Sequence, residues 1–185
     1  MADAPDVPRP APPRERRWLP VVIVTALLVA VAGGARSVAD ATASDTGPVT
    51  MGSVRVQPPE GWQIEGSVTP TFAQLHKGPV VLDITVEPSV AGGPVFLAAL
   101  YREQQLEPSF AHLLPGASEQ FILASGVPAA GFNYLADTAD GLLLEGLVIA
   151  ADAPDASVVF DVRAPAGDLA GVREDVRTMI EGATI

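Results

Sequence analysis

The chain has 185 residues, of which 48% are hydrophobic and 18% are charged. This length suits one folded domain and makes a two-domain enzyme an unfavourable interpretation. Its 11 basic residues stand against 22 acidic ones, a formal charge of -11, and such a balance argues against nucleic acid as a partner. The absence of cysteine excludes disulfides, thiolate nucleophiles, Cys-ligated zinc and a lipid attached to cysteine.

The N-terminal part of the sequence predicts a disordered arm followed by a membrane span. Residues 1–17 are rich in proline and small polar residues and offer nothing apolar to bury. Residues 18–35 then run for 18 positions without a charge. A helix of this length reaches about 27 Å, enough to cross a hydrocarbon core about 30 Å thick. Trp18 at the interface and Pro20 in the first turn are both compatible with an inserted helix.

A cleaved signal peptide is the alternative interpretation of this segment, because Ala30, Val31 and Ala32 before Gly33 form a small-x-small cleavage pattern. The 17-residue leader ahead of the apolar run favours an uncleaved signal anchor. In both cases the basic residues before the run hold the N-terminus in the cytoplasm. We therefore expect a single-pass cell-membrane protein with an extracytoplasmic domain, or a secreted one if the leader is removed.

The exported part carries the acidity of the chain. From Arg36 onward there are 7 basic and 19 acidic residues, a charge that repels anionic lipid head groups and keeps a domain soluble. Residues 36–48 are small and polar and predict a flexible tether. Residues 49–185 are long enough to fold alone.

Most of this domain has the pattern of β-strands. The segments 80–86 and 158–162 alternate apolar and other residues with a period of two, and prolines or Asp155 bound them. Five weaker strands are predicted at 54–57, 72–76, 119–124, 131–136 and 142–150. The segment from Asp137 to Gly141 predicts a tight turn; a calcium loop fails because Glu145 stands at its ninth position and not at its twelfth.

Two segments have helical periodicity instead. One runs from about Val95 to Leu106, with Pro94 at its start and Pro108 expected to stop it. The other places its apolar residues on one stripe, with Asp168 as the expected N-cap and Gly182 as the end: Leu169, Val172, Val176, Met179 and Ile180. The predicted fold class is α+β, an antiparallel sheet of about six or seven strands packed with two helices.

The sequence resembles PsbP-type domains. The resemblance rests on the opening run from Val54 to Trp62, the helix after two strands, Gly126-Val127-Pro128-Ala129 before a strand pair, and the closing helix. That family includes the photosystem II extrinsic subunit, a Ran-binding nuclear import factor and LpqN-type lipoproteins of actinobacteria. The resemblance would cover residues 49–185 and implies an α/β/α sandwich used mostly for binding. The lipid-bearing cysteine of the lipoprotein members is missing, and the span at 18–35 would replace it.

The sequence assembles no catalytic or metal-binding motif. It lacks Gly-x-Ser-x-Gly and the glycine loops that cradle phosphates. His76 and His112 have no second histidine at ligand spacing, and the acid pairs Asp137 with Asp140 and Asp152 with Asp155 lie in predicted loops. We therefore expect a non-enzymatic protein without a cofactor or a metal.

Two aromatic residues are the candidates for contact with a partner or ligand, Trp62 and Tyr101. Trp62 follows a Pro-Pro-Glu-Gly turn and could anchor a ligand, but a lid on the core is the interpretation that the turn favours. The hypothesis for function is an extracytoplasmic binding or accessory module that recognises an envelope protein partner. The alternatives are a carrier of an apolar or lipid ligand, and a hydrolase that uses Ser, His76 or His112 and Asp.

Overall fold

The computed structural model describes residues 47–185. The predicted arm (1–17), the predicted span (18–35) and all but the last two residues of the predicted tether (36–48) lie outside the described residues. Within the described part, no helix combines the length and the apolar character that crossing a membrane requires.

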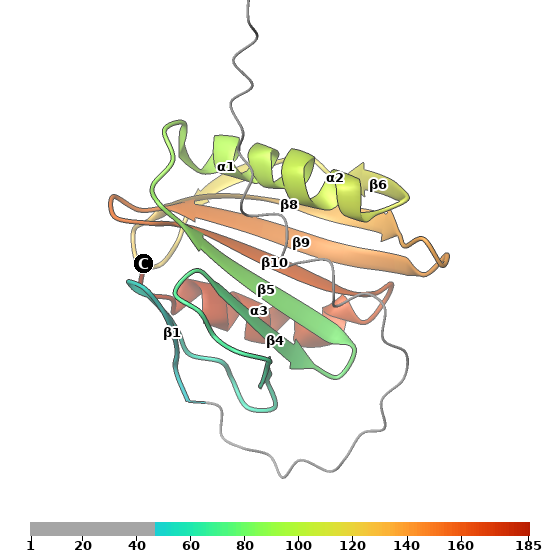
Figure 1. The fold of residues 1–185 in the computed structure, drawn as a ribbon, viewed down its shortest axis with the longest axis horizontal. Helices are drawn as coiled ribbons and strands as arrows, with labels where there is room; N and C mark the ends of the chain where they lie inside the picture. Colours follow the sequence, from blue (N-terminus) through green and yellow to red (C-terminus); the bar gives the residue numbers. More distant parts are fainter. Residues whose placement is uncertain (1–46) are drawn as a thin grey trace, which may run out of the picture. The chain divides into compact units, whose positions relative to one another are not determined.

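An antiparallel sheet of eight strands forms the middle layer of the domain (Figure 1). Seven of its strands lie in the order β3-β4-β5-β10-β9-β8-β6, and β7 pairs with β8 beside β6. A separate ribbon of two strands, β1 and β2, precedes the sheet in the chain. The strands are β1 (Val49–Met51), β2 (Val54–Val56), β3 (Gln63–Glu65), β4 (Phe72–Lys77), β5 (Val80–Glu87), β6 (His112–Pro115), β7 (Glu119–Ile122), β8 (Pro128–Asp137), β9 (Leu143–Asp152) and β10 (Ser157–Pro165).

The fold confirms the α+β class and the antiparallel sheet, but the strand count needs correction. The sheet has eight strands where about six or seven were predicted, and the strand at 54–57 belongs to the separate ribbon. The strands β1, β3 and β6 were missed because three or four residues are too few to display a period of two. The turn from Asp137 to Gly141 is confirmed: it joins β8 to β9, and Gly141 has a φ of 82°.

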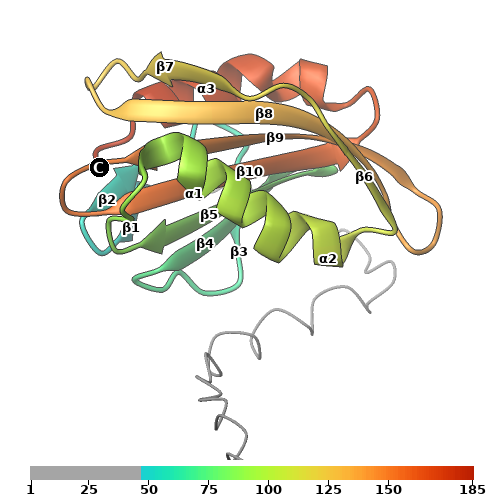
Figure 2. The ribbon, with the colours of Figure 1, turned by 90° about the horizontal axis from the view of Figure 1, so that it is seen from above.

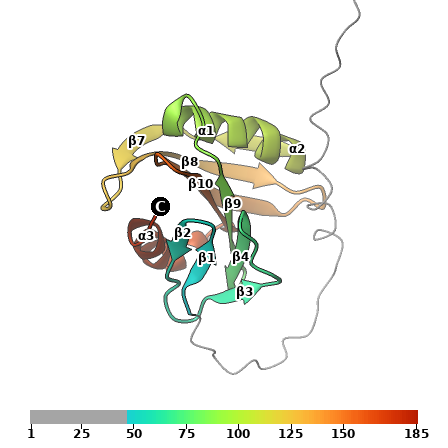
Figure 3. The ribbon, with the colours of Figure 1, turned by 60° about the vertical axis from the view of Figure 1, so that its left-hand side comes forward.

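Helices cover the two faces of the sheet (Figure 3). On one face, α1 (Gly93–Tyr101) continues into a π-helical turn (η1, Arg102–Leu106) and a last short turn, α2 (Glu107–Ser109). The predicted helix is thus present, but Pro108 does not stop it. Proline fits the first turn of a helical segment, so the helical run ends one residue later, at Ser109. Seen from above, α1 runs across β8, β9 and β10 (Figure 2).

On the other face lies α3 (Arg173–Glu181), preceded by a 3-10 turn, η2 (Leu169–Val172). Gly182 ends the helix as predicted. Asp168 is the N-cap residue of η2, as predicted, but its side chain makes no capping hydrogen bond. Glu145 of β9 takes this role: its Oε1 accepts the backbone N–H groups of Gly167 and Leu169 at 2.9 and 2.8 Å.

Each face has its own hydrophobic core. The larger core, between the sheet, α3 and the β1–β2 ribbon, contains the fully buried Trp62 and Phe160. The smaller core lies under α1 and contains Leu97, Phe132 and Tyr134. The sheet alternation explains this division, because neighbouring residues of one strand point to opposite faces.

Trp62 ties the larger core to α3 through a short polar chain. Its indole Nε1 donates to Asp175 Oδ2 at 3.2 Å, and Lys77 Nζ donates to the same oxygen at 2.7 Å. The Lys77 ammonium and the Trp62 indole hold the pKa of Asp175 below its usual value. This arrangement joins β4, the turn before β3 and the helix at one point.

We predict that Asp175→Asn lowers the free energy of unfolding at pH 7 by about 0.2–1 kcal/mol, the range of partly exposed ion pairs. Asn retains an oxygen for the indole, so the substitution removes the charge alone. Because the folded-state pKa of Asp175 is depressed, its stabilisation is complete above the unfolded carboxyl pKa and is lost as pH falls through the folded one. Denaturant unfolding between pH 2 and pH 7 measures this, with Glu174→Gln as an exposed control. A difference that stays constant across that pH range would contradict the assignment.

Candidate binding surface

The structure places the two predicted contact residues on opposite faces of the sheet and does not bring them together. Trp62 is 0% exposed in the core beneath α3, so it presents no surface to a partner. Tyr101 is half-buried at the end of α1, against the smaller core. Its hydroxyl donates to Asp161 Oδ2 at 3.1 Å.

Tyr101 belongs to a buried polar network centred on Asp161, which is 1% exposed. Tyr134 donates to Asp161 Oδ1 at 2.8 Å, and Arg163 Nη1 lies 3.2 Å from Oδ2. The same Arg163 nitrogen lies 2.6 Å from Asp83 Oδ2. Both oxygens of Asp161 are therefore occupied by donors of the protein itself, which is what a buried carboxylate requires.

Burial dominates the electrostatics of this network. Desolvation raises the pKa of Asp161 above its usual value, although Arg163 and the two tyrosines act in the opposite direction. Desolvation and the neighbouring carboxylate raise the pKa of both Tyr101 and Tyr134. Burial disfavours the charged Arg163, but Asp83 and Asp161 more than compensate, so its pKa is also raised. The network holds the end of α1 on the sheet through protonated tyrosines and a charged arginine.

The network needs a glycine in β9. A Cβ on Gly146 would stand 2.1 Å from the Tyr134 ring, so the ring of Tyr134 lies directly over this position. Gly146 pairs with both Tyr134 and Arg163 across the sheet. Only the absence of a side chain lets the tyrosine lie flat enough to reach Asp161.

The two histidines considered for the hydrolase alternative lie in different parts of the sheet. His76 is in β4, next to the strand at one edge, and His112 is in β6, at the other edge. In residues 47–185, no cluster of three or more His, Asp or Glu side chains has the arrangement of a metal site. The predicted acid pairs lie in the loops and strand ends around β8 to β10.

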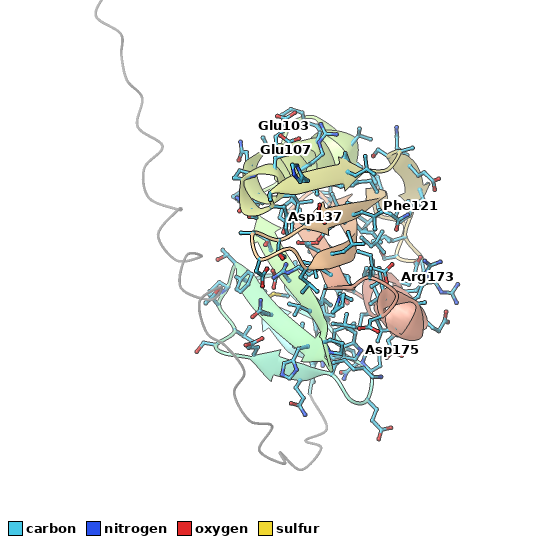
Figure 4. All side chains as sticks on the ribbon, turned by 90° about the vertical axis from the view of Figure 1, so that its right-hand side faces the viewer. Glu103, Glu107, Phe121, Asp137, Arg173 and Asp175 are labelled. Carbon is cyan, nitrogen blue, oxygen red and sulfur yellow. The ribbon has the colours of Figure 1, made fainter. Side chains whose placement is uncertain are left out.

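An apolar groove lies between α3 and the strands β7 to β9. We call it the outer groove; its volume is about 270 Å³. Its floor consists of Leu147 and Ile149 of β9 and Asn133 of β8, its upper wall of Phe121 of β7, and its lower wall of Val176 and Ile180 of α3. Figure 4 shows Phe121 and Arg173 on the same side of the molecule.

Charged residues of α3 stand at the mouth of the outer groove. Arg177 is paired with Glu174 at 2.7 Å, and Glu181 Oε2 accepts the backbone N–H of Ala124 at 2.5 Å. Arg173 also lines the groove, and it is exposed without an ion pair to any residue from 47 to 185. The groove thus combines an apolar floor with an available positive charge.

Two exposed leucines lie on the same face of the sheet as the outer groove. Leu114 of β6 is 68% exposed and lies directly across from Leu135 of β8, which is 43% exposed. Leu135 is on the groove side because its neighbours Tyr134 and Ala136 point into the core under α1. Its partner in β9 on this face is Glu145, so the leucine pair and the outer groove are two separate apolar features that one partner could cover.

The sequence analysis did not predict the outer groove, although one sequence pattern pointed to it. The predicted strand 142–150 has apolar residues at consecutive positions, such as Leu147, Val148 and Ile149. This pattern indicates that both faces of a strand need cover. The sequence could not show that α3 would leave the groove-side residues half-buried.

We predict that Gly146→Ala destabilises the domain by about 1–3 kcal/mol, because its methyl group would overlap the Tyr134 ring and force it away from Asp161. Denaturant unfolding measures the loss. Gly171→Ala is the matched control: a Cβ there meets nothing within 4 Å, so the change should stay within about 0.5 kcal/mol. Equal stabilities of the two variants would show that the tyrosine does not need this space.

Comparison with known proteins identifies the fold and not a family. No protein-family profile matches the sequence, and no curated protein matches it either. Solved structures do resemble the domain. The cyanobacterial PsbP protein (CyanoP) of Synechocystis sp. PCC 6803 is 10% identical with a TM-score of 0.56, over 83% of this chain and 98% of that one.

Two further structures have the same architecture. LpqN of Mycobacterium tuberculosis, described as involved in cell envelope biogenesis, is 11% identical with a TM-score of 0.56, over 74% of this chain and 88% of its own. The Ran-binding protein Mog1p of Saccharomyces cerevisiae is 9% identical with a TM-score of 0.53, over 72% and 90%. At these identities the likeness concerns the fold alone. The described domain therefore has the PsbP-like fold that its sequence motifs indicated.

Proposed function

We propose that this protein is a membrane-anchored, extracytoplasmic binding or accessory module that recognises an envelope protein partner and catalyses no reaction. The single observation that carries the proposal is the outer groove, an apolar depression with two exposed leucines on the same face of the sheet. Exposed apolar surface costs solubility, and a domain of this acidity would otherwise have a polar face there. A protein partner that covers the groove would account for it.

The open shape of the groove favours a protein partner over the carrier hypothesis. Pockets that enclose small molecules have volumes of about 300–1,000 Å³ and bury most of the ligand surface. The outer groove, at about 270 Å³, is near the lower end of that range and opens to solvent at a charged mouth. One or two apolar side chains of a partner would fit it, whereas a lipid would remain largely in contact with water.

The solved structures support the proposal by analogy. One neighbour of similar fold is described as Ran-binding and another as involved in envelope biogenesis. The envelope location itself rests on the sequence of residues 18–35, whose 18 uncharged positions predict the signal anchor.

Site-specific photo-cross-linking in intact cells tests the binding role. A benzophenone amino acid at Phe121, in the groove wall, or at Leu135, on the same face of the sheet, should give an adduct with one specific envelope protein. The matched control is Phe96, an exposed aromatic residue that is 48% accessible on α1, across the sheet. The same adducts from all three positions, or adducts from Phe96 alone, would rule out the groove as the recognition surface.

Labelling of the single lysine tests the location. Lys77 is the only lysine of the chain, and its side chain is 37% exposed on β4. An amine reagent that cannot cross membranes should modify Lys77 in whole cells and leave the N-terminal amine unmodified until lysis. Mass spectrometry of the tryptic peptides reads both sites, with Lys77→Arg as the control. Modification of Lys77 only after lysis would place the domain inside the cell.

A further inference from the structure

The edge of the sheet beside the outer groove differs in its two halves. β6 and β7 both pair with β8, so both are edge strands at this end of the sheet. Edge strands expose backbone N–H and C=O groups that can pair with another chain, and proteins normally protect such edges with proline, charge or a cover. The question is which half is protected.

β6 is protected by a proline. The backbone N–H of Gly116 donates to Asn133 O at 2.7 Å, so the residue before it, Pro115, points its backbone away from β8, since ladder bonds alternate along a strand. Proline has no N–H to offer at this outward position. A chain added along β6 would lack a ladder bond there.

β7 contains no proline, and its only charged residue, Glu119, is at its first position. The N–H of Leu123 donates to Val127 O at 3.0 Å and continues the register of β7 with β8. By the same alternation, Phe121 and Glu119 bond to β8, and the backbone groups of Gln120 and Ile122 point outward. All four residues of β7 are exposed, and no hydrogen bond within residues 47–185 satisfies the outward groups of these two.

The edge of β7 and the outer groove adjoin through one residue. Phe121 belongs to β7 and also forms a wall of the groove, while Arg173 stands at the mouth below it. Arg173 has no ion-pair partner in the described domain, in an exported region that carries 19 acidic and 7 basic residues. Arg173 is therefore a cation that a carboxylate of a partner can pair with at this place.

We propose that the partner recognised by this protein binds by strand addition: an extended segment of the partner pairs with the outward backbone groups of β7. An apolar side chain of that segment enters the outer groove, and a carboxylate of the same segment pairs with Arg173. The inference rests on the proposed binding function and specifies the chemistry of its partner. Backbone pairing supplies affinity in this mode, and the side-chain pocket supplies specificity.

A second copy of the chain is a poorer occupant of this edge than a partner segment. Pairing β7 with β7 of another copy would bring two strongly acidic domains together, with Glu119 on each of the paired strands. A short partner segment whose carboxylate pairs with Arg173 avoids the approach of a second acidic domain and of a second Glu119.

The test uses a phage-displayed library of random 12-residue peptides selected on the full-length protein in detergent. The enriched peptides should have apolar residues at every second position and should contain Asp or Glu. Addition of such a peptide should slow the hydrogen exchange of the Gln120 and Ile122 amides in the unaltered protein, since bonded amides are protected.

Variants separate the two contacts. Arg173→Glu should weaken peptide binding about tenfold, whereas Arg55→Glu, the same charge change at an exposed side chain of β2, should leave it unchanged. Gln120→Pro removes one outward N–H while keeping the bonds to β8, and should weaken binding by a similar factor. An unchanged thermal midpoint of unfolding shows that this variant is folded.

Several results would overturn the inference. The first is that the protein enriches no peptide beyond what the empty support retains. The second is that the selected peptides bind without slowing amide exchange at Gln120 and Ile122. The third is that Arg173→Glu leaves the peptide affinity unchanged. Protection of those two amides that rises with protein concentration alone would assign the edge to a second copy. The cross-link from Phe121 in cells tests the proposed binding function independently of strand addition. If the adduct persists in the Gln120→Pro variant, the binding function is retained and strand addition is ruled out.

Discussion

The arrangement of this domain depends on a difference in size: the helices are too small to cover the sheet. β6 and β7 share one edge of β8, so the sheet is seven strands across, and at about 4.8 Å per strand it is about 29 Å wide. The helices α1 and α3 have nine residues each and are about 13 Å long. Two such helices cannot bury both faces, even with the extra turns η1 and α2 and with the β1–β2 ribbon. Each face is therefore left partly open, on a different part of the sheet.

The parts of the two faces beyond the helices have opposite chemistry. On the face of α1, this part leads into a polar row in which Gln74 donates to Asp83, and Arg163 bridges Asp83 to the buried Asp161. The side chains of this row satisfy one another's hydrogen bonds. On the face of α3, this part is the outer groove, where Leu147 and Ile149 are half-buried and Phe121 is exposed. Because apolar surface is left partly uncovered there, we propose that face for recognition.

The sequence predicted the layers well and the open surfaces poorly. Long alternating strands such as β5 and β10 and the apolar stripe of α3 are local patterns, so they can be seen without tertiary structure. Asp168 illustrates the limit: it occupies the predicted N-cap position, but Glu145, from a strand distant in sequence, accepts the backbone hydrogen bonds there. Trp62 could be read either as an anchor or as core, and only the packing of α3 decides that it is enclosed.

The candidate site was beyond sequence reasoning for the same reason. Phe121, Leu147 and Arg173 lie in three elements, and none of them stands out within its own segment. Their proximity follows from the strand order, which places β7 and β9 on either side of β8. The buried network has the same character, because Tyr101 and Asp161 come together only through the crossing of α1 over the sheet.

The pairing of the last residues with the first ribbon has a consequence for how this domain can be handled. Arg55 of β2 exchanges two backbone hydrogen bonds with Thr184, both of 2.9 Å, and β2 pairs in turn with β1, where the described domain begins. The start and the finish of the folded unit are therefore neighbours in space. A short linker could join them, so new termini opened in the exposed turn around Gly141 would give a circularly permuted domain, and the unit could be inserted whole into a surface loop of another protein.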